Sequence, residues 1–130
     1  MSTLRVVSTD KSPAAIGPYS QAIVANGFVF ASGQIPVNPE TNNIVSDHVQ
    51  EQVRQTLRNL SNVLEAANSS LSRVVKTTVY IKDMNDFSAI NETYAEQGEE
   101  YLSGVLLLSN DLYRLFRFLV TPDLPERVLR

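Results

Sequence analysis

The clearest hydrophobic pattern in the chain is a stripe of apolar residues that recurs every three or four positions from Val49 to Ala67. This spacing predicts an amphipathic helix, because residues three and four apart share one helical face. The intervening polar residues occupy the opposite face of the predicted helix. Ser46 or Asp47 is predicted to cap its N-terminus, where a side-chain oxygen can accept a hydrogen bond from a free backbone N–H group.

Three other segments show the pattern of strands. Residues 74–82 are rich in β-branched residues, which suit a pleated surface. Their alternation places one set of side chains on the same face, namely Val75, Thr77, Val79 and Ile81. Residues 19–24 and 28–32 predict two further strands, joined by Asn26-Gly27, a dipeptide typical of tight hairpin turns.

The remaining elements up to residue 96 complete an α+β pattern. Residues 35–43 contain two prolines and three asparagines, which predicts a loop. A second helix is predicted to begin at a capping cluster in residues 83–86, followed by Phe87, Ile90 and Tyr94 at helical spacing. The order is therefore β-β-α-β-α, and two helices on one face of a mostly antiparallel sheet is the economical arrangement.

The residues after Gln97 no longer follow this order. Ser109-Asn110-Asp111 resembles a helix cap. Four apolar residues then recur at helical spacing, Leu112, Leu115, Phe116 and Leu119. With Arg114 and Arg117 on another face and prolines beyond, they predict a third, short amphipathic helix. We therefore divide the single domain into residues 1–96 and a divergent tail, residues 97–130, which completes or replaces its end.

Composition limits the possible chemistry. A chain of 130 residues is expected to form one compact domain. The net charge of −3 argues against a dedicated nucleic-acid binder, which usually presents a basic face. The absence of cysteine excludes disulfides, thiolate catalysis and zinc–thiolate sites. His48 is the only histidine, so a two-histidine mechanism or a histidine-rich metal site is excluded as well.

The chain carries no signal for export or membrane insertion. Its first ten residues lack the apolar stretch of a secretory signal peptide. No apolar run approaches the roughly 18 residues that a membrane span needs. We expect a cytoplasmic protein, with a mitochondrial location left open.

Four sequence blocks in residues 12–96 resemble one enzyme family. They are residues 13–22 (PAAIGPYSQA), 32–37 (SGQIPV), 75–83 (VKTTVYIKD) and 86–95, which contain Asp86-Phe87 and the run NETYA. In this order and spacing, they resemble the RidA family, also called YjgF/YER057c/UK114, of reactive-intermediate or imine deaminases. The resemblance implies a chorismate-mutase-like α+β fold and a homotrimer with ligand sites between subunits.

The same resemblance implies an activity and four site residues. Such proteins hydrolyse 2-imino acids, for example 2-iminobutanoate and 2-iminopropanoate, to 2-oxo acids and ammonia without a cofactor. Tyr19, Ser32, Gly33 and Asn91 match family residues that line the substrate cleft. No metal site is implied.

Two expected catalytic groups are missing from the matching positions. In the family, an arginine in a Pro-Ala-Arg-Ser-Cys-like motif binds the substrate carboxylate, and a glutamate on the final strand holds the water. Neither motif occurs after Gln97, and Arg114, Arg117 and Glu126 lack the family surroundings, so no role is transferred to them. We therefore expect an impaired deaminase. The alternatives are a non-catalytic binding or regulatory protein, with an RNA, translation or chaperone-like role, and an inactive isoform.

Two explanations of the tail stay open. Without closing strands the sheet would have an exposed edge, which invites pairing with another chain. The tail could come from an alternative exon, a retained intron or a frameshift, which we favour, or it could be a replacement that packs residues 105–108 and the predicted third helix on the open sheet. The first explanation puts the homotrimer in doubt.

Overall fold

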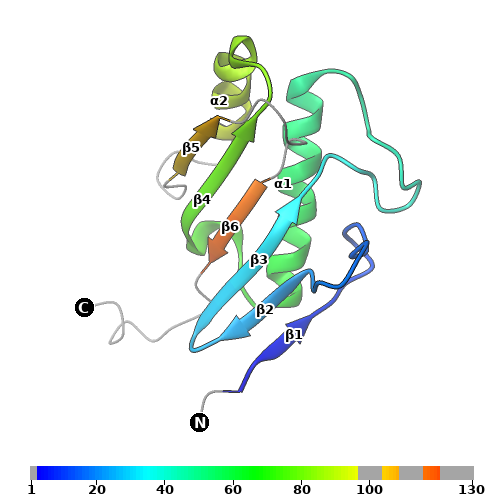
Figure 1. Ribbon diagram of the computed structural model, residues 1–130, viewed down its shortest axis with the longest axis vertical. Coiled ribbons are helices and arrows are strands. Elements are labelled where there is room, and N and C mark those ends of the chain that lie inside the picture. Colours follow the sequence, from blue (N-terminus) through cyan, green and yellow to red (C-terminus); the bar gives the residue numbers. More distant parts are fainter. Residues whose placement is uncertain (1–2, 97–103, 109–115, 121–130) are drawn as a thin grey trace.

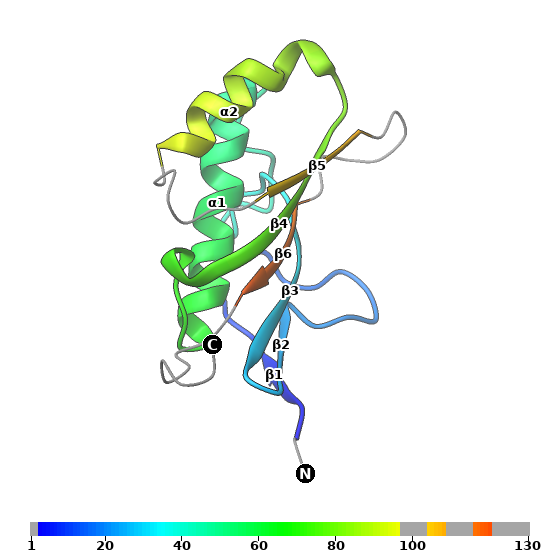
Figure 2. The same cartoon turned by 90° about the vertical axis from the view of Figure 1, so that its left-hand side faces the viewer.

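A single sheet with two helices on one face makes up the described part of the chain (Figures 1 and 2). The computed structural model describes residues 3–96 and the backbone of residues 104–108 and 116–120. The elements in chain order are β1 (Arg5–Val7), β2 (Ala22–Ala25), β3 (Phe28–Gln34), α1 (Val49–Ala66), β4 (Val74–Ile81), α2 (Phe87–Ala95), β5 (Gly104–Leu108) and β6 (Phe116–Val120). Short 3-10 turns precede β4 and α2, at Leu71–Arg73 and Met84–Asp86.

The strands lie in the order β1-β2-β3-β6-β4-β5. All neighbours are antiparallel except β4 and β5, which run parallel. Figure 2 shows α1 and α2 together on one side of the sheet. The predicted α+β class and the two helices on one face of a mostly antiparallel sheet are thus confirmed. None of the helices in the described ranges is long and apolar enough to cross a membrane.

The predicted apolar stripe of α1 forms the centre of the core. Leu57, Leu60 and Leu64 are almost completely shielded from solvent. They belong to one buried cluster with Val29 of β3 and Val79 of β4. Burial of these side chains is the main favourable term that holds α1 on the sheet, because each one removes apolar surface from water.

The hairpin between β2 and β3 forms at the predicted turn, but its first strand spans Ala22–Ala25 rather than residues 19–24, because residues 19–21 belong to the loop before it. Asn26 and Gly27 have φ angles of 51° and 78°. Two successive positive φ angles are the signature of a type I′ turn, whose twist matches that of the flanking strands. The pairing of Ala25 with Phe28 closes the hairpin directly beside this turn. The three-residue strand β1, which pairs with β2, was not predicted because it is too short to show an alternating pattern.

The predicted third helix is wrong for residues 116–120, which form strand β6. This strand lies between β3 and β4 and pairs with both. Residues 112–115 of the predicted helix lie outside the described residues. A short apolar run fits a buried strand as well as a helix, and here the strand form supplies hydrogen-bonding partners to β3 and β4. Residues 104–108 also join the sheet, as strand β5 beside β4.

Three smaller predictions also need correction. Val75 is 44% exposed and its neighbour Val74 is buried, because the register between β4 and β6 shifts between Val74 and Lys76. Such a bulge exchanges the faces of the residues before it. The N-cap of α1 is His48, with no side-chain cap, while the Ser46 hydroxyl accepts a hydrogen bond from the His48 N–H at 3.0 Å. In the cluster predicted to cap α2, Asp83 instead caps the 3-10 turn by accepting from the Asn85 N–H at 3.0 Å. The N-cap of α2 is Asp86, which makes no side-chain cap hydrogen bond.

Polar contacts connect α2 to its neighbours. The Tyr94 hydroxyl lies 2.6 Å from the Thr77 hydroxyl of β4. Burial raises the pKa of Tyr94, and the hydrogen bond with Thr77 opposes this rise. Arg54 of α1 donates to both carboxylate oxygens of Glu96, at 3.0 and 3.1 Å. These hydrogen bonds lower the pKa of Glu96 and raise that of Arg54, but both groups are exposed, so the pair adds little stability.

Asn59 holds the loop after β3 against α1. Its side chain is completely buried, and its amide nitrogen donates to the carbonyl oxygens of Ile35 and Val37, at 3.0 and 2.8 Å. Its amide oxygen accepts from Gln55 at 2.8 Å. Its backbone carbonyl accepts from the Ser12 hydroxyl at 2.6 Å. One residue thus fixes two separate loops, and both lead to or from β2 and β3.

Replacement of Asn59 should be far more costly than replacement of a similar residue on the same helix. Asn59→Ala leaves two loop carbonyls and the Gln55 amide without their partner, so we expect a loss of about 3 kcal/mol in the free energy of unfolding. Asn62 makes one exposed hydrogen bond, to the carbonyl of Lys11 at 2.8 Å. Asn62→Ala is the matched control, with an expected loss of about 1 kcal/mol or less. Urea unfolding measures both, and equal losses would contradict this role of Asn59.

Candidate functional site

Three of the four predicted site residues line one open hollow. Tyr19, Ser32 and Gly33 surround a space of about 810 Å³. The other lining residues are Pro18, Ser20, Ile23, Phe30 and Ala31. Phe30 is 49% exposed, whereas its neighbours in β3 are buried toward α1. The hollow therefore opens on the face of the sheet turned away from the helices, where the loop before β2 projects (Figure 2).

Ser32, in β3, is hydrogen-bonded to the segment directly before β2, which also lines the hollow. Its hydroxyl donates to the carbonyl of Ser20 at 2.5 Å, and its N–H donates to the carbonyl of Gln21 at 2.9 Å. With its proton committed to Ser20, the hydroxyl oxygen can still accept a hydrogen bond. Ser32 therefore holds the segment before β2 against β3, and its hydroxyl oxygen can also accept a hydrogen bond from a ligand N–H group.

Tyr19 lies at the rim of the hollow. Its side chain is half exposed, and its hydroxyl accepts a hydrogen bond from the Ile16 N–H at 3.2 Å. Because that contact uses the oxygen as acceptor, the hydroxyl proton can be donated to a ligand. Gly17 allows the tight loop that this contact needs, since its φ of 132° is a conformation that other residues rarely adopt.

Gly33 lies in a bulge of β3. The register with β6 shifts between Ala31, which pairs with Phe118, and Gln34, which pairs with Phe116. Ser32 and Gly33 together therefore face the single position 117. A bulge of this kind leaves an extra residue without its regular hydrogen bonds to the neighbouring strand, and such bulges are common beside functional sites.

Sequence reasoning missed Gln21, which shapes the loop in front of the hollow. Its amide nitrogen lies 3.0, 3.3 and 2.9 Å from the carbonyl oxygens of Thr9, Ser12 and Pro13. Its amide oxygen accepts from the Thr9 N–H at 2.7 Å. The side chain is buried. The sequence did offer one indication of this role. Gln21 belongs to the GPYSQ run that carries the family resemblance, but only Tyr19 of that run was assigned a site role.

Asn91, the fourth predicted residue, does not line the hollow. It is exposed on α2, which covers the opposite face of the sheet. His48 is exposed at the start of α1 and does not line the hollow either. Within the described ranges, no group of three or more acidic, histidine or cysteine residues could hold a metal ion.

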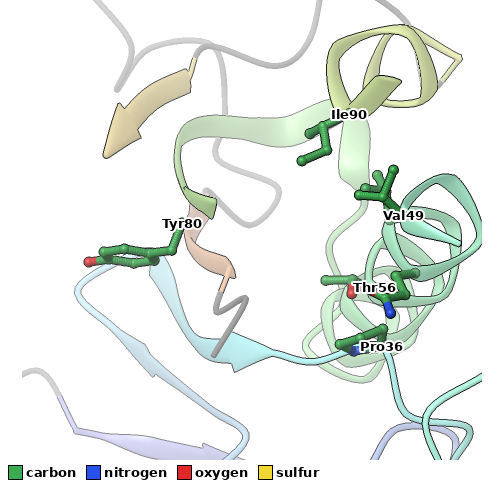
Figure 3. Close-up of a pocket in the computed structure, with 7 residues that line it drawn as sticks. Pro36, Val49, Thr56, Tyr80 and Ile90 are labelled. Carbon is green, nitrogen blue, oxygen red and sulfur yellow. The ribbon is translucent and has the colours of Figure 1, made fainter. Parts of the chain in front are cut away.

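A second cavity, between the two helices and the sheet, is too small for an organic ligand. Its volume is about 10 Å³, which is room for about one water molecule. Figure 3 shows Val49 and Thr56 of α1, Ile90 of α2 and Pro36 turned toward one another, while the ring of Tyr80 points away. A third pocket, of about 250 Å³, is lined by Arg54, Leu57, Arg58, Ser61, Leu71 and Glu96. The open hollow around Ser32 is larger than both and holds three of the predicted site residues, so it is the candidate substrate site among the described residues.

The strands of the tail carry neither of the expected catalytic groups. β5 reads GVLLL and β6 reads FRFLV, so β5 has no arginine and β6 has no glutamate. Arg117 is the only charged residue in the two strands. It was expected on the wet face of a helix and instead lies in the middle of β6.

Comparison with known proteins supports the resemblance. A family model described as Endoribonuclease L-PSP matches residues 9–103. A RutC family protein of Pyrococcus horikoshii is 54% identical over 91 residues, which cover 70% of this chain and 72% of that protein. The human 2-iminobutanoate/2-iminopropanoate deaminase is 46% identical over 92 residues, 71% of this chain and 67% of that protein.

Solved structures with the same fold match beyond the end of the family model. A putative endoribonuclease from Thermotoga maritima has a TM-score of 0.86 and 37% identity, over 92% of this chain and 98% of that one. E. coli TdcF with bound serine has a TM-score of 0.84 and 35% identity, over 92% and 99%. The likeness in fold thus extends further along the chain than residues 9–103, where the sequence match lies.

The loop before β2 should depend on Gln21 much more than on the other buried glutamine of this region. Among the residues that the structure describes, the Gln34 side chain makes one hydrogen bond, to the Ser32 carbonyl at 3.2 Å. We expect Gln21→Met to lower the free energy of unfolding by about 2–3 kcal/mol and Gln34→Met by about 1 kcal/mol or less. Hydrogen exchange should become faster in residues 9–20 for Gln21→Met only. Similar stability losses and unchanged exchange in that loop would contradict this role of Gln21.

Proposed function

The chain belongs to the RidA (YjgF/YER057c/UK114) family, and on this premise we propose that it is a 2-imino acid deaminase of reduced activity. In the proposed reaction, water adds to the C=N carbon of 2-iminobutanoate or 2-iminopropanoate. The C–N bond then breaks, which yields the 2-oxo acid and ammonia. The gathering of Tyr19, Ser32 and Gly33 around one hollow is the observation that carries the proposal.

The hollow has suitable groups for such a substrate. Tyr19 can donate a hydrogen bond, Ser32 can accept one, and Phe30 offers an apolar surface to a short alkyl chain. The names of the relatives agree with a ligand of this size, since two are called imine deaminases and TdcF was solved with serine. Orientation by a few fixed polar groups is what a small substrate requires.

We expect a reduced rate of imine hydrolysis because β5 and β6 lack the catalytic groups of the family. Without a glutamate in β6, no carboxylate of that strand holds or deprotonates the attacking water. Loss of a positioned general base typically lowers a rate by about 10²–10⁴-fold. Turnover should therefore be detectable but slow.

We further propose a homotrimer, as the resemblance implies, and keep the cytoplasmic location that was expected from the sequence. A site between subunits would explain the place of Asn91, which lies apart from the hollow within one chain. A neighbouring copy could then supply this side chain. No cofactor is part of the proposal.

The name Endoribonuclease L-PSP raises RNA cleavage as a competing function. The chain offers it little support. The net charge is −3, and the single histidine, His48, does not line the hollow. Incubation with a structured RNA is thus a useful control in the activity test.

The proposal is tested by ammonia release from 2-iminobutanoate generated in situ by a threonine dehydratase. We expect acceleration over spontaneous hydrolysis, at a rate about 100-fold or more below that of the human relative assayed in parallel. Tyr19→Phe should lower the rate further, whereas His48→Ala should leave it unchanged. Turnover equal to that of the human relative would refute the impairment, and no acceleration at any protein concentration would refute the deaminase.

A further inference from the structure

We infer that one water molecule is bound inside the protein, where it bridges the side chains of Gln52 and Thr56 on α1. The water lies in the cavity of about 10 Å³ between the two helices and the sheet. This site is distinct from the hollow around Ser32, which opens on the other face of the sheet. Binding of this water is therefore independent of the proposed deaminase activity.

Two buried oxygen atoms have no hydrogen-bond partner in the protein. Among the buried side-chain polar atoms of the described residues, they are Gln52 Oε1 and Thr56 Oγ1. Thr56 is completely shielded from solvent. Most buried polar atoms in folded proteins bond either to protein or to ordered water, because an unpaired one loses the hydrogen bond that it had in bulk water. Both oxygens therefore require a partner from outside the polypeptide.

Both oxygen atoms belong to residues that line the same cavity. Gln52 and Thr56 are four residues apart on α1, so their side chains lie on one helical face. In Figure 3, Thr56 and Ile90 of α2 are turned toward the space between the helices and the sheet. The other lining residues are Pro36, Val49, Val53 and Tyr80. The unpaired oxygens and the cavity thus coincide, although they are independent observations.

The size and the lining of the cavity favour water over other ligands. A volume of about 10 Å³ is at the lower limit for one water molecule and leaves no room for a larger ligand. None of the seven lining residues is charged, so no group of opposite charge offsets the loss of hydration that an ion would suffer there. Water can form hydrogen bonds with both oxygens, since it donates two protons and the Thr56 hydroxyl can donate or accept.

The direction of the Gln52 amide explains why its oxygen needs a donor. Its nitrogen donates to the carbonyl of Ser46 at 2.7 Å. A carbonyl can only accept, so this contact fixes the nitrogen toward the loop before α1 and leaves the oxygen without a donor. The water supplies that donor and holds the amide in this orientation. It thereby adds to the contacts that hold residues 35–46 against α1, together with the two hydrogen bonds that Asn59 donates to the same loop.

A crystal structure of the full, unaltered chain tests the water directly. We expect one ordered water within about 3 Å of both Gln52 Oε1 and Thr56 Oγ1. A cavity without density, in a map that shows other ordered waters, would overturn the inference. A Thr56 hydroxyl bonded to the Gln52 backbone carbonyl would also overturn it, since the hydroxyl would then have its partner within the helix.

Replacement of the hydroxyl tests the same water in solution. Oxygen-17 magnetic relaxation dispersion counts long-lived internal waters, and Thr56→Val should lower this count by one. Thr93→Val is the matched control, because Thr93 is as deeply buried on α2 and its hydroxyl donates to the Ala89 carbonyl at 3.0 Å. Thr93→Val should leave the count unchanged. Equal counts in the two variants would refute the bound water.

Urea unfolding of Thr56→Val gives a second, independent outcome. With the water bound, the change removes one of its two partners, so the midpoint of urea unfolding should fall. Without the water, the same change would replace an unpaired buried hydroxyl by a methyl group, and the midpoint should rise. A raised midpoint would therefore contradict the bound water. Should Thr56→Val not fold, the crystal structure of the unaltered chain decides.

Discussion

The pairing of β6 with both β3 and β4 is the constraint on which the rest of the structure depends. No direct pairing joins β3 to β4 among the described residues, so β6 alone connects the β1–β3 part of the sheet to β4 and β5. Its residues come from a part of the chain far from both partners. The continuous surface on which α1 packs therefore forms only when this late segment is in place.

The same pairing creates the candidate site. The bulge at Ser32 and Gly33 is defined by the register of β3 against β6. Ser32 then holds the Ser20–Gln21 segment, and Gln21 holds the loop that starts at Thr9. The hollow is thus built on β3 of the sheet. The loop beside it is fixed by hydrogen bonds from the Ser32 and Gln21 side chains to backbone carbonyls. A site of this kind can bind a small ligand without rearrangement.

Local sequence patterns correctly predicted the elements whose conformation is determined by their own residues. The helix of Leu57 and Leu60, the hairpin at Asn26-Gly27 and the strand of Thr77 and Val79 all appear where they were expected. The strand form of residues 116–120 could not be predicted in this way. Its apolar residues fit helical spacing, and only contacts with β3 and β4 decide the conformation. The exposed Val75 was mispredicted for a related reason, because a bulge is set by the partner strand.

The family resemblance identified part of the site for a different reason. Tyr19, Ser32 and Gly33 belong to two sequence blocks, and the fold brings these blocks together. Gln21 escaped the same reasoning. The role of Gln21 depends on carbonyls in a loop that no local pattern connects to it.

Cross-strand nuclear Overhauser effects test most directly whether β6 lies between β3 and β4. Thr78 and Arg117 are direct partners, as are Ala31 and Phe118. Opposite backbone protons in such pairs are close enough to give strong signals. If β6 lies between β3 and β4, both contacts are expected in the folded chain. Sequential helical contacts across residues 116–120, with neither cross-strand contact present, would contradict this position of β6.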